Sequence, residues 1–87
     1  MAYDPPYADS AVAPARAPFA ITPSDTEPLP RVTKAIYVGT GGAVLLRGVD
    51  GAADVAYRNV PAGAYLEVCA SHVRATGTTA SDLVGEA

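Results

Sequence analysis

Few residues of this 87-residue chain have the types and spacing that chemistry at a site requires. The sequence holds one cysteine and one histidine, Cys69 and His72. Three residues apart on an extended strand, their side chains would point to opposite faces and would not ligate one ion together. A structural zinc site needs four such ligands. We therefore expect no metal and no cofactor, with Cys69 as a small packing residue and His72 exposed or at an interface.

The residue types of a hydrolytic triad are present in Ser24, Asp25 and His72, but their positions are not those of a known motif. The sequence has no Gly-x-Ser-x-Gly turn that would hold a nucleophilic serine. Asp50 and Asp54 flank an expected turn and are more typical of solvated carboxylates. We predict no catalytic residues and expect that the protein is not an enzyme.

A glycine-rich stretch, Gly39-Thr-Gly-Gly42, superficially resembles a phosphate-binding loop. Such loops lie between a strand and a helix, whereas Ala43-Val-Leu-Leu46 has the apolar, β-branched character of another strand. Before the glycines, Ile36 and Val38 would share one face of a strand. The stretch therefore predicts a hairpin in which the glycines make the reversal.

Residues 31–87 read as one domain of short strands separated by turn residues. Asp50-Gly51 and Val60-Pro-Ala-Gly63 are turn signals, and residues 55–59 alternate as a strand does. The longest alternating run, residues 64–73, predicts a half-buried strand that is bent or bulged. Thr78 or Thr79 is expected to cap a single helical turn over residues 80–84. Five or so strands of this kind predict an all-β fold, an antiparallel sandwich or a small barrel.

Residues 1–30 read as an extended, proline-rich N-terminal arm, because seven of the eight prolines lie there while all eight glycines lie from Gly39 onward. Prolines exclude a regular helix and a central strand. A disordered tail is one interpretation. The alternative is an arm that orders along a neighbouring subunit, with mainly intermolecular contacts, since it carries the apolar anchors Tyr3, Tyr7, Phe19, Ile21 and Leu29. Order is expected to begin near Phe19.

Size and charge narrow the class of partner. So small a core, without a disulfide, is commonly stabilised by association with copies of itself or with another protein. The net charge is −3, and the six basic residues are scattered, which argues against nucleic acid. No apolar run approaches the ~20 residues of a membrane span, and the N-terminus lacks the features of a signal peptide. We therefore expect synthesis in the cytoplasm and no membrane partner.

Three tyrosines are candidates for a binding surface. Tyr37, Tyr57 and Tyr65 are predicted on outward faces of the strands, where they would be ordinary surface aromatics, subunit anchors or platforms for a sugar. The sequence pattern leaves these alternatives open.

Four short sequence segments together resemble the spike base proteins of alphaproteobacterial gene transfer agents and related tailed-phage heads. In order along residues 19–84, they are Phe19-Ala-Ile-Thr-Pro-Ser-Asp-Thr26, Ala35-Ile-Tyr-Val-Gly39, Asn59-Val-Pro-Ala-Gly63 and Val73-Arg-Ala-Thr-Gly-Thr-Thr-Ala80. Residues 83–87 depart from the family, because this C-terminal segment is small and polar where bulkier apolar residues are expected.

The resemblance implies a virion structural protein with a jelly-roll-like β-sandwich, assembled as a homo-oligomer of five at capsid vertices. Its implied partners are the major capsid protein and a spike fibre protein that contacts host surface polysaccharide. The implied location is the surface of a phage-like particle assembled in the bacterial cytoplasm. The alternatives are a glycan-binding module that acts through exposed tyrosines, or a tail or baseplate adaptor.

Overall fold

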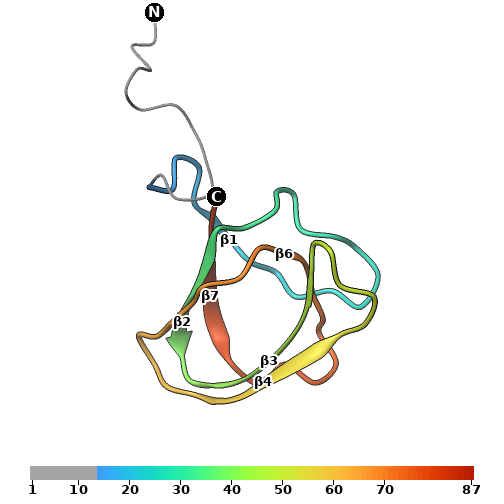
Figure 1. Ribbon diagram of the computed structural model, residues 1–87. Helices are drawn as coiled ribbons and strands as arrows, with labels where there is room; N and C mark the ends of the chain where they lie inside the picture. Colours follow the sequence, from blue (N-terminus) through green and yellow to red (C-terminus); the bar gives the residue numbers. More distant parts are fainter. Residues whose placement is uncertain (1–13) are drawn as a thin grey trace, which may run out of the picture.

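The computed structural model describes residues 14–87 and shows an all-β fold of two antiparallel sheets, as the sequence predicted. The first sheet, sheet A, has the order β1-β7-β2-β5, and the second, sheet B, has the order β4-β3-β6 (Figure 1). The strands are β1 (Phe19–Ala20), β2 (Ala35–Thr40), β3 (Gly42–Gly48), β4 (Val55–Val60), β5 (Tyr65–Leu66), β6 (Ala70–Val73) and β7 (Ser81–Glu86). Within residues 14–87 there is no helix, and so none that could cross a membrane.

The core lies between the sheets and is built by alternation along each strand. Ile36 and Val38 of β2 are fully buried, as the sequence predicted, and face Val44 and Leu46 of β3 across the interior. β-branched and leucine side chains suit this pleated, half-buried surface. Leu66, Ala70, Val73 and Leu83 complete the centre of the cluster. Each sheet therefore has one face in the core and one face turned outward.

The predicted hairpin at Gly39–Gly42 is wrong, because β2 and β3 belong to different sheets. The glycines instead make a corner where the chain leaves sheet A and enters sheet B (Figure 1). A side chain does not fit there: a Cβ on Gly42 would lie 2.7 Å from the hydroxyl oxygen of Thr79, and one on Gly41 would lie 2.7 Å from the carbonyl oxygen of Val60. The glycines allow close backbone approach at a sheet corner rather than a tight reversal.

Two further expectations are corrected by the same change of sheet. Residues 64–73 are not one strand but two, because β5 pairs with β2 in sheet A and β6 pairs with β3 in sheet B. Residues 81–86 form β7, which pairs with β1 and β2, rather than a helical turn. Leu83, Gly85 and Ala87 alternate inward, so the small residues at this end build a strand of sheet A.

The described part of the arm lies along its own domain. The backbone N–H of Ile21 donates to the carbonyl oxygen of Leu83, and those of Ser24 and Leu29 donate to the carbonyls of Val73 and Ser71. Phe19 and Ala20 thus extend sheet A as β1, and residues 24–29 cover the outer edge of β6 in sheet B. β1 begins at Phe19, and before it the backbone N–H groups of Arg16 and Ala17 donate to the carbonyl oxygen of Ala87.

Candidate partner-binding surface

The outer face of sheet A carries a row of apolar and aromatic side chains across all four strands. The strand register aligns Ala20 of β1 with Val84 of β7, Val84 with Tyr37 of β2, and Tyr37 with Tyr65 of β5. The rings of Tyr37 and Tyr65 lie 5.2 Å apart between centroids and are tilted by 60°, a favourable arrangement for an aromatic pair. Tyr65 is 57% exposed. We call these four side chains the sheet A row.

The sheet A row confirms that Tyr65 faces outward, and it places Tyr37 beside it in half-buried surroundings. Tyr57 does not join them, because it lies on β4 of sheet B. Tyrosines with one apolar face and one exposed edge are typical of protein interfaces. The sheet A row is therefore the candidate partner-binding surface of this sheet.

Two other candidate anchors, Phe19 and Ile21, have an intramolecular position in this structure. Ile21 is only 8% exposed and belongs to the core cluster, and Phe19 packs against that cluster. The ring of Phe19 lies directly over Gly85 of β7, its register partner. These contacts fasten the arm to sheet A, and any contact of Phe19 or Ile21 with another chain stays a prediction. Tyr3 and Tyr7 lie outside the described residues.

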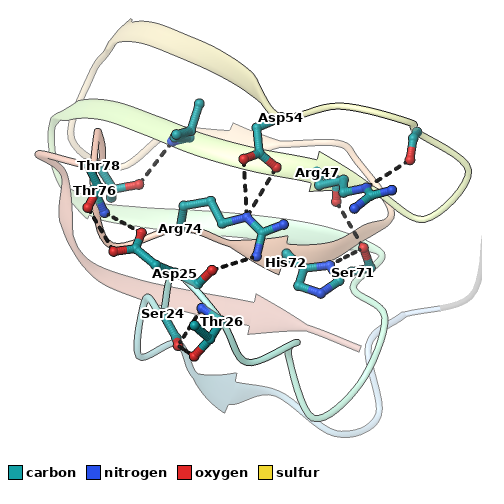
Figure 2. A network of polar contacts seen from close by, with 12 residues as sticks. Ser24, Asp25, Thr26, Arg47, Asp54, Ser71, His72, Arg74, Thr76 and Thr78 are labelled. Atoms are coloured by element: carbon teal, nitrogen blue, oxygen red, sulfur yellow. Dashed lines mark hydrogen bonds and ion pairs between the residues drawn. The ribbon is translucent and has the colours of Figure 1, made fainter.

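A network of polar contacts spans the outer face of sheet B and fixes the arm there (Figure 2). The Asp25 carboxylate accepts hydrogen bonds from the backbone N–H and the hydroxyl of Thr76, both at 2.8 Å. Arg74 donates through Nη1 to the carbonyl oxygen of Asp25, and its Nε lies 3.2 Å from the carboxylate of Asp54. The arm, the loop after β6 and the start of β4 are thereby joined.

The hydrogen bonds from the backbone N–H of Thr76 and then from its hydroxyl hold the pKa of Asp25 below its ordinary value. Donors that bind the ionised carboxylate favour that form over the protonated one. An ionised Asp25 therefore strengthens the contact of the arm with the loop, to which Arg74 also contributes through the Asp25 carbonyl.

The residue types of a hydrolytic triad are engaged with separate partners. Ser24 accepts hydrogen bonds from the backbone N–H groups of Thr26 and Glu27, which is typical of a serine in a turn. Asp25 binds Thr76, while Nδ1 of His72 lies 2.7 Å from the hydroxyl of Ser71 (Figure 2). Each of the three therefore has a local structural role.

Cys69 was expected to be a packing residue, and this is wrong, because the structure leaves it exposed. It lies in the connection between β5 and β6, outside both strands, so the alternation of the sequence does not bury it. Within residues 14–87, no group of three or more His, Cys, Asp or Glu side chains is placed to hold a metal ion.

Tyr57 was a predicted candidate, but its expected outward position is wrong, because it lies on the core-facing side of β4; Val55 beside it is a candidate that sequence reasoning missed. Val55 and Tyr57 lie opposite the buried Leu46 and Val44 in the strand register, yet they are 56% and 37% exposed. The alternation of residues 55–59 was visible in the sequence. The exposure of Val55 and Tyr57 was not visible, because it depends on packing between segments that are far apart in the sequence.

Comparison with known proteins shows that the chain is similar to a protein of known structure. No model of a known protein family matches the sequence, and no curated protein matches it. Among solved structures, the chain is similar to a chain from the structure titled "Capsid of native GTA particle computed with C5 symmetry". The two are 42% identical, the match covers 98% of each chain, and the TM-score is 0.82.

Proposed function

Since this chain belongs to the family of the matched chain from the gene transfer agent capsid, we propose that it forms the base of a head spike on a phage-like particle. The family makes it a structural component of such particles, and a capsid-related relative favours a non-enzymatic role. The observation that carries the proposal is the match itself, because it covers 98% of both chains and therefore includes the whole small domain.

The spike base that we propose is a ring of five copies at a capsid vertex. The capsid that contains the matched chain was computed with five-fold symmetry, and a ring of five copies is compatible with that symmetry. In this assembly residues 31–87 would form the body of each subunit, and residues 1–30 would form its arm. The major capsid protein would bind on one side of the ring, and a spike fibre protein that contacts host polysaccharide would bind on the other.

The sheet A row supports a protein partner for this face. An open row of four side chains across a sheet suits a flat protein surface, and tyrosines at its exposed end suit a desolvated contact. A sugar ring is bound by a free aromatic face. Here the two tyrosine rings are tilted against each other. We therefore propose that the row contacts the capsid or the fibre.

The experiment is a binding assay with particle heads that lack this protein. The purified chain should sediment with such heads and should not bind purified host polysaccharide in calorimetry. Replacing Tyr65 by Ser should reduce sedimentation, whereas Glu67→Gln, at an exposed position directly after β5, should leave it unchanged. Binding to polysaccharide by the chain alone would favour the glycan-binding alternative. Binding only to isolated tails would favour a baseplate adaptor.

A further inference from the structure

The strand β4 carries exposed apolar side chains on its core-facing side. Val55 and Tyr57 point to the same side of sheet B as their register partners on β3, which are buried. Val60 is the one buried residue of β4 itself. Apolar side chains that stay exposed on a core-facing side are typical of a surface that another segment of chain completes.

Within residues 14–87, β4 is also the one long sheet edge that stays unpaired. Its neighbour in sheet B is β3 alone. The edge strands β1 and β5 of sheet A have two residues each, and the arm covers the outer edge of β6. Proteins usually shorten, cover or interrupt such edges, because their N–H and C=O groups pair readily with another chain. The register of β4 is regular from Val55 to Tyr57, and the left-handed backbone of Asn59 interrupts it only afterwards.

One stretch of the N-terminal arm is suited to pair with this edge. Proline cannot donate a hydrogen bond to a neighbouring strand. The longest stretch without proline in residues 1–30 is Tyr7-Ala-Asp-Ser-Ala-Val-Ala13, which directly precedes Pro14. In an extended chain, Ser10 and Val12 fall on one side of this stretch, and Asp9 and Ala11 fall on the other.

An antiparallel alignment of residues 9–13 with residues 54–58 matches both faces of β4. The pairs are Asp9 with Arg58, Ser10 with Tyr57, Ala11 with Ala56, and Val12 with Val55. Valine then meets valine on the apolar, core-facing side, and the two charged residues meet on the outer side. A shift of one residue would exchange the faces. In a parallel alignment with the same ion pair, Val12 would lie beyond Asn59, where β4 is no longer regular.

The charges of the two segments fit the same alignment. Arg58 is exposed, and within residues 14–87 its side chain forms no ion pair. Asp9 is the one charged residue of residues 7–13. Asp54 is already bound to Arg74 of its own copy, and the alignment places the uncharged Ala13 opposite it. The added strand therefore supplies an anion for Arg58 and leaves the existing ion pair intact.

The segment that pairs with β4 has to come from another copy. The carbonyl oxygen of Pro14 accepts a hydrogen bond of 3.2 Å from Nζ of Lys34, which fastens the start of the described chain to sheet A. β4 is an edge strand of the other sheet, and Figure 1 shows the two on opposite sides of the molecule. Ala13 lies only ~3.8 Å from Pro14 between Cα atoms. It therefore cannot reach Asp54 of its own copy.

We propose that residues 9–13 of one copy add as a strand to the open edge of β4 in the next copy, antiparallel to residues 54–58. In contacts of this kind the backbone hydrogen bonds provide affinity, and alternate side chains provide specificity. The contact joins two different surfaces of identical chains, so it is head-to-tail and generates a ring when it closes. The inference rests on the proposed function, which places copies of this chain side by side around a vertex.

Disulfides between copies test the contact on assembled particles. In a Cys69→Ser background, Val12→Cys is combined with Val55→Cys, the particles are oxidised, and the chains are separated on a non-reducing gel. Opposed residues of paired strands have Cα atoms about 4.5–5.5 Å apart, which suits a disulfide. We expect a ladder of covalent oligomers that reduction abolishes. A bond within one chain would give a monomer that migrates faster, and that result would overturn the contact between copies.

Two neighbouring pairings are the matched controls for register. Val12→Cys with Ala56→Cys places the thiols on opposite faces and should give little or no ladder, whereas Ala11→Cys with Ala56→Cys should restore the ladder. Equal yields from all three pairings would overturn the alignment. Particles that carry these chains at their vertices without any ladder would overturn the contact and leave the spike base proposal intact. Vertices that lack even the Cys69→Ser parent chain would overturn both.

Charge reversal gives a second, independent test in the Val12→Cys, Val55→Cys chain. Asp9→Lys or Arg58→Glu alone should lower the yield of the ladder about fivefold, because each replaces an attraction by a repulsion. The double reversal should restore the yield to within about twofold of the starting value. Single reversals without effect, or a double reversal as weak as the two losses combined, would contradict the alignment.

Discussion

Thr33 is a buried polar residue that joins the end of the arm to the crossover between the sheets. Its side chain is 1% exposed. The hydroxyl donates to the carbonyl oxygen of Val68 at 2.8 Å and accepts from the backbone N–H of Ala70 at 3.0 Å. Both groups lie where the chain passes from β5 to β6. The hydroxyl therefore satisfies backbone groups at a point where neither sheet supplies partners.

Replacing Thr33 by Val keeps the shape of the side chain and removes the hydroxyl. The N–H of Ala70, in fully buried surroundings, then loses its acceptor, and the carbonyl of Val68 loses its donor. A buried polar group left unpaired costs about 1–3 kcal/mol. We expect the free energy of unfolding to fall by about 2–3 kcal/mol and the melting temperature to fall by about 10 °C or more.

Thr33→Ser is the matched control, because it keeps the hydroxyl and removes one methyl group, at a cost of about 1 kcal/mol. Both variants are measured by urea unfolding at one protein concentration, since association would shift the midpoint. A valine variant as stable as the serine variant would refute the reasoning, because packing rather than hydrogen bonding would then hold this crossover.

Three further predictions concern the arm, the fit of β1 on β7 and the bulge of β4. The lowered pKa of Asp25 means that the stabilising effect of its carboxylate is complete above the ordinary value of 3.8 and is lost as the pH falls below that value. Asp25→Asn should therefore flatten the acid limb of a plot of urea midpoint against pH. An unchanged acid limb would contradict this prediction. A Cβ on Gly85 would lie 2.5 Å from Cζ of Phe19. Gly85→Ala should displace the ring, lower the free energy of unfolding by about 1–3 kcal/mol and speed hydrogen exchange at residues 19–21. Unchanged hydrogen exchange would show that the ring is not held there. Asn59 has a φ of 58°, a left-handed backbone that glycine adopts without strain. Asn59→Gly should leave the free energy of unfolding in urea nearly unchanged, whereas Asn59→Val should lower it by about 1–2 kcal/mol. Equal urea midpoints for the two variants would contradict this prediction.

The class of fold could be predicted from the sequence because alternation and turn residues are local signals. Ile36 and Val38 show a period of two, and Pro61 and Gly63 mark the turn that follows β4. What failed was the assignment of strands to sheets. A glycine corner and a glycine hairpin have the same composition, and only the crowding around Gly42 distinguishes them.

The end of the chain shows a signal that was available and was misread. Leu83, Gly85 and Ala87 alternate with Asp82, Val84 and Glu86, which is a strand pattern with small inward residues. Threonines before the segment favoured a capped helical turn instead. Gly85 is small because Phe19 packs over it, and that contact joins residues 66 positions apart in the sequence. Non-local contacts of this kind cannot be read from a single segment.

The binding surface was predictable in residue type and only partly in place. Tyrosines on outward faces were expected, and Tyr37 and Tyr65 meet on sheet A as a pair. The exposure of Val55 and Tyr57 on the core-facing side of β4 depends instead on non-local packing, which alternation does not determine. The resemblance of four short sequence segments indicated a gene transfer agent protein, and the match to a chain of the gene transfer agent capsid then established that family.

Electron cryomicroscopy of particles that contain this protein tests the central claim most directly. A reconstruction of the capsid vertices should show density that fits residues 14–87, repeated around each five-fold axis, with a fibre attached on the outer side. Density for this chain at the tail baseplate, with vertices that lack it, would contradict the account.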